Sequence, residues 1–276
     1  MKKIIYLFLA VGLCCGMWSC NKDEIADGNG GNTIPKEMEK AFPDPIFRQY
    51  VLDNFDKDKD GKISQEEALR VTSINCPSKG IKSLDGIQYF TNLKTLSCYS
   101  NQLTDLDVSQ NTALTELRCK SNKLTDLDVS KNTALTLLDC YYNQLTTLDV
   151  SKNTALTDLN CMSNKLTSLD LSKNTALTEL QCHSNQLTAL DVSKNTALTD
   201  LECFSNQLTS LDVSKNTALK TLFCYFNQLT SLDVSKNTAL TELDCDPNPL
   251  TTIYMKQGQT IADLSKPGSA EIVYVK

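Results

Sequence analysis

The apolar residues of this chain follow one pattern, L-x-x-L-x-C-x-x-N-x-L, that recurs along most of its length. The pattern returns every 21 residues, with its cysteines at positions 98, 119, 140, 161, 182, 203, 224 and 245. A fixed period of this length indicates a repeat architecture, in which each copy buries its apolar face only against its neighbours. The pattern therefore predicts one elongated solenoid rather than several globular domains.

The spacing within a copy predicts where each apolar residue points. Leu117 and Cys119 are two positions apart, so they lie on the same side of a short strand and face the core. Leu124 and Leu127 then fill the core from behind. Parallel stacking of such strands predicts an α/β-type repeat solenoid with a parallel sheet on its concave face, a helical N-terminal cap and a β C-terminal cap.

The asparagine of each copy is predicted to lie inside and to bond the turn backbone of neighbouring coils, because buried polar groups need partners. These structural residues stand at positions 101, 122, 143, 164, 185, 206, 227 and 248. The nearly invariant Leu-Asp-Val-Ser-Lys-Asn-Thr-Ala segment is expected on the outer curve as solvated surface. There its aspartates, such as Asp149, are expected to offset the repulsion among its lysines, such as Lys152.

The repeats are predicted over residues 74–253, with lengths of 21 or 22 residues. Residues 254–276 are expected to hold a degenerate repeat, in which Lys266 replaces the cysteine, and a cap. Within this cap, residues 270–276 predict a closing strand that covers the open core and the exposed sheet edge.

The N-terminal residues predict export and anchoring. Residues 1–19 combine two lysines with an apolar run and predict a signal peptide, which is too short for a membrane span. The sequence around Cys20 resembles a bacterial lipobox, so Cys20 is the expected lipidation site. Residues 21–24 resemble the export tag of Bacteroides-type lipoproteins, or are simply a solvated charged tether. With a flexible tether over residues 20–42, we expect a lipid anchor in the outer membrane and outward display.

Residues 43–73 predict a helical cap that contains a calcium loop. Asp44 and Pro45 predict the start of a helix. The twelve residues that follow this helix, 56–67, match the EF-hand calcium loop, with Gly61 at its sharp turn. Six residues are expected to coordinate one structural Ca²⁺ ion: Asp56, Asp58, Asp60 and Glu67 through carboxylates, Lys62 through its backbone carbonyl and Ser64 through a water molecule. The alternative is an exposed acidic loop without an ion, in which the carboxylates would repel each other.

The net charge of the chain argues against one class of partner, nucleic acid. The net charge is −6, and removal of Lys2 and Lys3 with the signal leaves 25 basic and 33 acidic residues, or −8. Because no basic stripe is present, nucleic acid is not an expected partner.

The nine cysteines from Cys76 to Cys245 each hold one repeat position and are expected to be reduced and buried. A metal-binding thiolate row is the alternative, but the paired C-x-x-C ligands of zinc sites are missing.

Nearly all variation between copies falls on positions that flank the inward leucine and cysteine. Aromatic residues gather there, and exposed aromatic rows on a rigid sheet suit binding. The candidate ligand-binding residues are Tyr99, Leu137, Tyr141, Tyr142, His183, Phe204, Phe223, Tyr225 and Phe226. The alternative is drift at unconstrained positions after duplication of the repeats.

The chain does not predict an enzyme. His183 is its one histidine. Glu179 and Asp200 are expected to flank this residue, but a catalytic triad also needs a pocket and an oxyanion hole. We therefore interpret His183 as one more variable surface residue.

From about residue 44 to 264 the sequence resembles leucine-rich repeat proteins of the internalin type, above all the internalin J kind with cysteine at the strand position. The resemblance implies a right-handed leucine-rich repeat horseshoe with an EF-hand-like cap and a role in adhesion or ligand capture. The expected anchor differs, since a lipid at Cys20 replaces a wall-sorting motif. We therefore expect a monomeric surface module that binds a protein or glycan, with a structural envelope component as the alternative.

Overall fold

The structure, a computed structural model, describes residues 34–276, which belong to one compact unit of the chain. The signal peptide predicted over residues 1–19 and the lipidation site Cys20 lie outside the described residues. No helix within residues 34–276 combines the length and apolar character that crossing a membrane would require.

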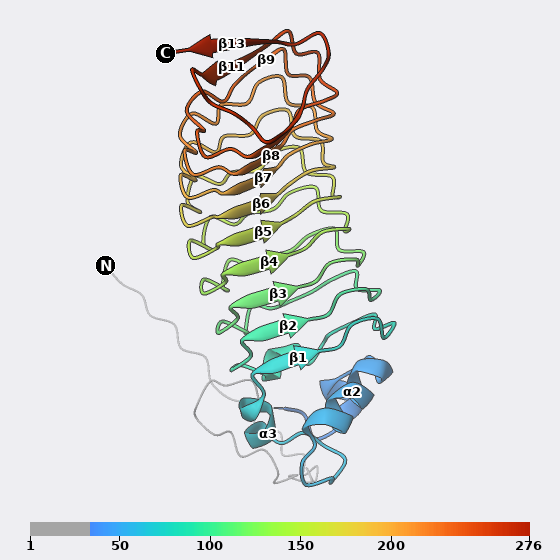
Figure 1. The fold of residues 1–276 in the computed structure, drawn as a ribbon. Coiled ribbons are helices and arrows are strands. Elements are labelled where there is room, and N and C mark those ends of the chain that lie inside the picture. The colour runs from blue at the N-terminus through green and yellow to red at the C-terminus, as the bar shows by residue number, and fades with distance from the viewer. Residues whose placement is uncertain (1–33) are drawn as a thin grey trace, which may run out of the picture. The chain divides into compact units, whose positions relative to one another are not determined.

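The repeats form the predicted solenoid, in which each coil adds one short strand to a parallel sheet (Figure 1). Equivalent residues of successive coils pair in register, for example Leu117 with Leu138. The sheet has ten strands in this order: β1 (Ser73–Asn75), β2 (Thr95–Ser97), β3 (Glu116–Arg118), β4 (Leu137–Asp139), β5 (Asp158–Asn160), β6 (Glu179–Gln181), β7 (Asp200–Glu202), β8 (Thr221–Phe223), β10 (Glu242–Asp244) and β12 (Asp263–Ser265).

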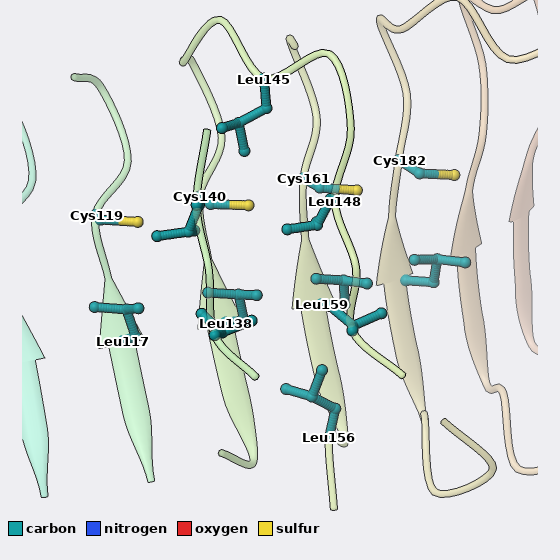
Figure 2. Packing of buried hydrophobic residues seen from close by; sticks show 14 of the residues in the cluster. Leu117, Cys119, Leu138, Cys140, Leu145, Leu148, Leu156, Leu159, Cys161 and Cys182 are labelled. Atoms are coloured by element: carbon teal, nitrogen blue, oxygen red, sulfur yellow. The ribbon is translucent and has the colours of Figure 1, made fainter. Parts of the chain in front are cut away.

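The core lies behind this sheet and consists of repeated leucine and cysteine side chains. Figure 2 shows Leu117 with Cys119 and Leu138 with Cys140 pointing to the same side of successive coils. All four side chains are fully buried. The nine described cysteines are free and buried, and burial raises the pKa of Cys161 to about 12. The thiols therefore act as apolar fillers rather than as nucleophiles.

The predicted asparagine ladder is confirmed. The side-chain amide of Asn143 donates to the carbonyls of Cys119 and Cys140, at 3.2 and 3.0 Å. Its Oδ1 accepts a hydrogen bond from the backbone N–H of Leu124 at 3.0 Å. Each asparagine thus ties the turn of its own coil to the turn of the preceding coil.

A second asparagine ladder runs through the segment that we expected to be solvated surface. Asn153 is fully buried and donates to the carbonyls of Val129 and Asn132, at 3.0 and 2.9 Å. Its Oδ1 is buried without a hydrogen-bond partner. The prediction for this segment was therefore wrong for its asparagine, because a polar residue between exposed neighbours can still turn inward to satisfy the backbone. The ladder comprises Asn111, Asn132, Asn153, Asn174, Asn195, Asn216 and Asn237.

The aspartates of the same segment close turns instead of pairing with lysines. Oδ1 of Asp149 accepts a hydrogen bond from the backbone N–H of Ser151 at 2.8 Å, and this bond lowers the pKa of Asp149. Among the described residues, no ion pair joins these aspartates to the lysines of the segment. The charge of Lys152 also lowers the pKa of Asp149, as a smaller contribution than the turn bond, so the charges offset each other without a direct ion pair.

The C-terminal coils build a second, three-stranded parallel sheet from β9 (Ser231–Asp233), β11 (Thr252–Lys256) and β13 (Glu271–Val275). The strand expected over residues 270–276 is present, but it pairs with β11 and does not cover the β12 edge of the ten-stranded sheet. After β12 the chain forms part of one more coil. Its last strand, β13, therefore pairs with β11 of the preceding coil.

The N-terminal cap is helical, as predicted, and contains α1 (Met38–Ala41), α2 (Pro45–Phe55) and α3 (Gln65–Arg70). A short 3₁₀ helix, η1 (Ile87–Tyr89), follows in the first repeat, between β1 and β2. Asp44 caps α2 through Oδ1, while its Oδ2 accepts the backbone N–H groups of Lys82 and Ser83. One carboxylate thus fastens the helix to the first repeat.

The tether predicted over residues 20–42 extends too far, because residues 38–42 are folded. Phe42 is fully buried, and its ring meets that of Phe47 edge to face, with centroids 5.9 Å apart. Gly86 makes room for this ring: a Cβ there would lie 2.2 Å from Cδ1 of Phe42. Burial of Ala41 and Phe42 against the core anchors the end of this segment.

Candidate functional site

The concave face presents three outward positions per coil: before the inward leucine, between leucine and cysteine, and after the cysteine. Most of the predicted ligand-binding residues occupy these positions, while Tyr142 and Phe226 lie one residue further on, in the turn. Tyr142 and Phe226 are 57% and 58% exposed, whereas the others are half-buried. Our expectation of freely exposed rings was therefore wrong for most of them.

The rings are half-buried because they pack on one another. His183 stacks on Phe204 with centroids 3.9 Å apart and planes 13° apart. Phe204 stacks on Tyr225 at 4.2 Å and 12°. Neighbouring strands lie about 4.8 Å apart, so planar side chains at the same position of successive coils meet face to face. The result is a continuous stack of three rings across β6, β7 and β8.

Tyr142 and Phe226 occupy a backbone conformation that aromatic residues rarely adopt. Both have φ of +50°, where most other coils place a serine, as at Ser121 and Ser163. Each ring contacts the preceding tyrosine edge to face, with centroids 5.3 Å apart for Tyr142 and 5.6 Å apart for Phe226. A left-handed conformation costs a non-glycine residue about 1–2 kcal/mol. Because the rings stay exposed, little packing offsets this cost.

Lys120 forms a contact that the sequence did not predict. Its Nζ lies 5.2 Å from the ring centroid of Tyr99 and 4.8 Å from that of Tyr141, within the range of a cation–π interaction. The same Nζ lies 3.3 Å from Oδ2 of Asp139. Burial alone would lower the pKa of Lys120, but Tyr141 and Asp139 raise it above its ordinary value. The sequence could have indicated this contact, because Lys120 follows its cysteine as Tyr99 and Tyr141 follow theirs in the two neighbouring copies.

Carboxylates line the concave face beyond this lysine. Asp158, Glu179 and Asp200 are direct register neighbours on β5, β6 and β7. Burial, together with the charges of Asp158 and Asp200, raises the pKa of Glu179. Asp139 also has a raised pKa, because burial outweighs the pull of Lys120, and its Oδ1 has no hydrogen-bond partner.

A shallow hollow of about 160 Å³ lies among these groups on β3 to β6. Its lining includes Arg118, Leu137, Asp139, Asp158, Asn160 and Glu179. A larger hollow of about 730 Å³ is lined by residues of the nearly invariant segment, among them Asp128, Asp149 and Asp170. The first hollow is lined by variable residues of the concave face, among them the predicted Leu137, so we take this face as the candidate site.

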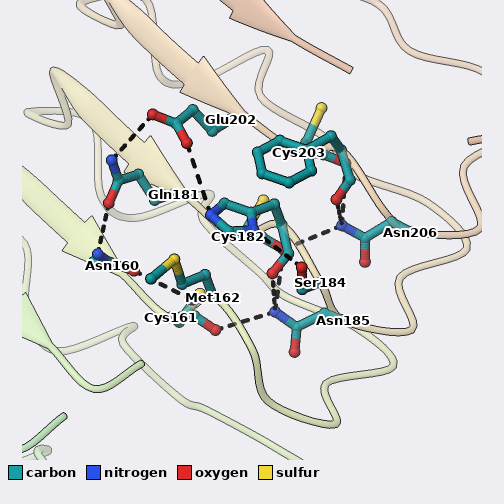
Figure 3. Close-up of polar contacts among 12 residues, drawn as sticks. Asn160, Cys161, Met162, Gln181, Cys182, Ser184, Asn185, Glu202, Cys203 and Asn206 are labelled. Atoms are coloured by element: carbon teal, nitrogen blue, oxygen red, sulfur yellow. Dashed lines mark hydrogen bonds and ion pairs between the residues drawn. The ribbon is translucent and has the colours of Figure 1, made fainter. Parts of the chain in front are cut away.

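His183 belongs to a polar row rather than to a catalytic group. Figure 3 shows Asn160, Gln181 and Glu202 linked across three strands. Nε2 of His183 lies 3.7 Å from Oε2 of Glu202, so the neighbouring carboxylate is Glu202 and not the expected Glu179 or Asp200. Burial lowers the pKa of His183 to about 4. The imidazole is therefore neutral at pH 7 and serves as one ring of the stack.

The predicted calcium loop brings three of its six ligands together. Carboxylate oxygens of Asp56, Asp58 and Asp60 all lie within 4.8 Å of one another. Oδ1 of Asp56 is buried without a hydrogen-bond partner. This donor set suits a hard cation such as Ca²⁺.

Two of the other predicted ligands, Ser64 and Glu67, are engaged within the protein. Oε1 of Glu67 accepts the N–H of Lys57 at 2.6 Å, and Oε2 accepts the N–H and Oγ–H of Ser64 at 2.9 and 2.8 Å. Burial alone would raise the pKa of Glu67, but these hydrogen bonds hold it below the usual value. The N–H of Lys62 donates to Oδ1 of Asp60 at 2.8 Å. Glu67 and Ser64 thus form the capping box of α3, which is separate from the three grouped aspartates.

Comparison with known proteins shows similarity to leucine-rich repeat proteins. The family model described as "Leucine Rich repeats (2 copies)" matches residues 91–132. Internalin J of Listeria monocytogenes serotype 4b (strain F2365) is 48% identical over 71 residues, which are 26% of this chain and 8% of that protein. Internalin C of Listeria monocytogenes serotype 1/2a (strain EGD / Mackaness) is 36% identical over 94 residues, which are 34% of this chain and 30% of that protein.

A solved structure extends the likeness over nearly the whole chain. The functional domain of InlJ from Listeria monocytogenes, which includes a cysteine ladder, superposes with a TM-score of 0.76 at 41% identity. The match covers 89% of this chain and 54% of the solved chain, so this chain spans about half of that relative and less of the others. The stacked coils, the buried cysteine row and these likenesses together give this chain a leucine-rich repeat fold of the internalin type, with an internalin J-like cysteine ladder.

Proposed function

We propose that this chain is a bacterial surface module that binds a protein partner through the aromatic residues of its concave face. Internalin-like leucine-rich repeat proteins typically mediate protein binding or adhesion, which supports the general function. The aromatic part of the proposal rests on Tyr142 and Phe226. Both rings are exposed and lie in left-handed backbone at a position where most other coils have serine. This favours the interpretation that the rings are retained to contact a partner over the alternative of sequence drift after repeat duplication.

The test is binding of the mature chain to arrays of envelope proteins, host proteins and glycans. The decisive variant replaces Phe204, Phe223, Tyr225 and Phe226 with alanine, and we expect it to lose at least about tenfold in affinity for a protein found on the array. Tyr274→Ala is the matched control, because Tyr274 is 58% exposed and lies on β13. Equal binding by the quadruple variant and the wild type would refute the proposal. Cross-linking only to envelope proteins of the same cell would favour the structural alternative.

We also propose that the loop of residues 56–67 holds one structural Ca²⁺ ion that stiffens the helical cap. Support comes from the three grouped aspartates and from the unpartnered buried oxygen of Asp56. Asp56, Asp58 and Asp60 would supply carboxylates, and the ion would neutralise their mutual repulsion.

We also propose that Cys20 is lipidated. Mass spectrometry of the chain extracted from membranes tests this modification. An unmodified Cys20 would remove the lipid anchor.

A further inference from the structure

We infer that the C-terminal half of the concave face receives a cationic segment of the partner, an extended stretch that carries arginine or lysine side chains. The inference rests on the proposed binding function and specifies its chemistry. The surface concerned, here called the acidic aromatic surface, comprises the outward positions of β5, β6, β7, β8 and β10 and the residues after their cysteines. Its aromatic members are His183, Phe204, Phe223 and Tyr225, beside the exposed Phe226.

The chain itself shows how this face holds a cation. The ammonium of Lys120 lies over the rings of Tyr99 and Tyr141 and beside the carboxylate of Asp139. All four residues occupy outward positions of neighbouring coils. An aromatic ring after the cysteine and a carboxylate before it thus form a working cation site on this sheet.

The acidic aromatic surface repeats these components without a cation of its own. Its outward positions carry seven carboxylates and no lysine or arginine: Asp158, Glu179, Asp200, Glu202, Glu242, Asp244 and Asp246. By contrast, β3 and the residue after its cysteine provide both Arg118 and Lys120. A face that concentrates one sign of charge around apolar rings attracts the opposite sign and orients its approach.

The like charges on this surface already disturb one another. The raised pKa of Glu179 reflects burial first and then the charges of Asp158 and Asp200. Burial also raises the pKa of Tyr225, with further contributions from Asp244 and Glu202. Tyr225 follows β8, and Glu202 and Asp244 lie on the two strands paired with β8, so this ring has a carboxylate on each neighbouring coil. A bound guanidinium would relieve the repulsion and stack on the ring in one step.

The length of the surface indicates an extended segment. The strands β5 and β10 stand four coils apart, which corresponds to roughly 19 Å at about 4.8 Å per strand. An extended chain of about six residues spans this distance. A neutral glycan could use the rings, but it would not require seven carboxylates.

The experiment measures binding of fluorescein-labelled hexa-arginine by fluorescence anisotropy. Hexa-citrulline serves as the neutral isostere. We expect hexa-arginine to bind at least about tenfold more tightly than hexa-citrulline, with an affinity that falls as salt rises. Glu202→Gln/Asp244→Asn and Phe204→Ala/Tyr225→Ala should each weaken binding about tenfold. The first variant is isosteric, so it tests the charges even if loss of the rings disturbs the fold.

The matched control is Asp105→Asn/Asp126→Asn, which removes the same charge from exposed residues that directly precede the nearly invariant segment and lie off the concave face. Equal weakening by this control, or equal binding of hexa-citrulline, would overturn the inference by showing only a general charge effect. A partner whose binding needs the rings but ignores Glu202→Gln/Asp244→Asn and salt would also overturn it, while the proposed function would stand. A partner that ignores the ring substitutions would refute the proposed function itself.

Discussion

The rings of Phe204 and Tyr225 lie parallel, with centroids 4.2 Å apart and planes at 12°, although 21 residues separate them in the sequence. The contact arises because the repeat length equals one coil of the solenoid. Any side chain therefore meets its counterpart in the next copy, and substitutions at variable positions combine into rows. The rows on the concave face are aromatic and acidic, while those behind the sheet are leucine, cysteine and asparagine.

Replacement of Asn153 by alanine should destabilise the solenoid by about 1–3 kcal/mol. The substitution removes hydrogen bonds to two buried carbonyls, although it also removes an Oδ1 that has no partner. Urea unfolding measures the effect. Thr154→Ala is the control, because Thr154 is exposed on the same turn. A free energy of unfolding within about 0.5 kcal/mol of the wild type would contradict a supporting role for the second ladder.

Tyr142→Ser should leave stability unchanged or raise it by up to about 1 kcal/mol. Serine occupies the same left-handed position in most other coils, so only an exposed edge-to-face contact with Tyr141 is lost. Binding of the array partner should weaken at the same time. Ser163→Tyr provides the reverse control and should destabilise the chain. A loss of more than about 1 kcal/mol in Tyr142→Ser would mean that the ring is retained for stability.

Calcium should raise the melting temperature of the wild-type chain, and a chelator should lower it. An ion that binds only the folded state stabilises it by about 2.7 kcal/mol at one hundred times its dissociation constant. Asp56→Asn/Asp58→Asn should abolish the shift, since it removes two of the three grouped carboxylates. Identical melting curves of metal-free and calcium-loaded wild type would exclude the structural ion.

Acidification from pH 6.5 towards pH 4 should reduce stability through His183. Its folded pKa of about 4 lies below the ordinary value of about 6.5, so the unfolded state binds the proton first. The contribution of the neutral ring is full above pH 6.5 and is lost as the pH falls to about 4, with a size on the order of 1–3 kcal/mol. His183→Phe keeps the stack and should flatten this part of the profile. An NMR titration that finds an ordinary pKa for His183 would contradict the prediction.

The sequence predicted the framework because its signals depend on short spacings. Leu117 and Cys119 are two residues apart, which alone places them on one side of a strand. Asp44 followed by Pro45 likewise marks the start of α2, and the observed N-cap matches. The first asparagine ladder was predictable because its residue follows the buried cysteine at a fixed distance. In each case the partners are local or repeat at the coil period.

The character of the concave face depended on contacts between coils. The sequence identified the variable positions, but whether a ring is exposed depends on what the next coil carries: Phe204 is covered by His183 and Tyr225, whereas Tyr142 is not stacked. Lys120 looked like one variable residue until the fold set it between two tyrosines.

By itself, then, the sequence determined the period, the inward residues and the capped helical start, because these follow from the geometry of one strand or one turn. Only the tertiary structure decided that Asn153 is buried, that His183 is a neutral ring beside Glu202, and which carboxylates crowd together. Burial and electrostatic shifts are sums over neighbours from other coils, and those neighbours are fixed only when the coils stack.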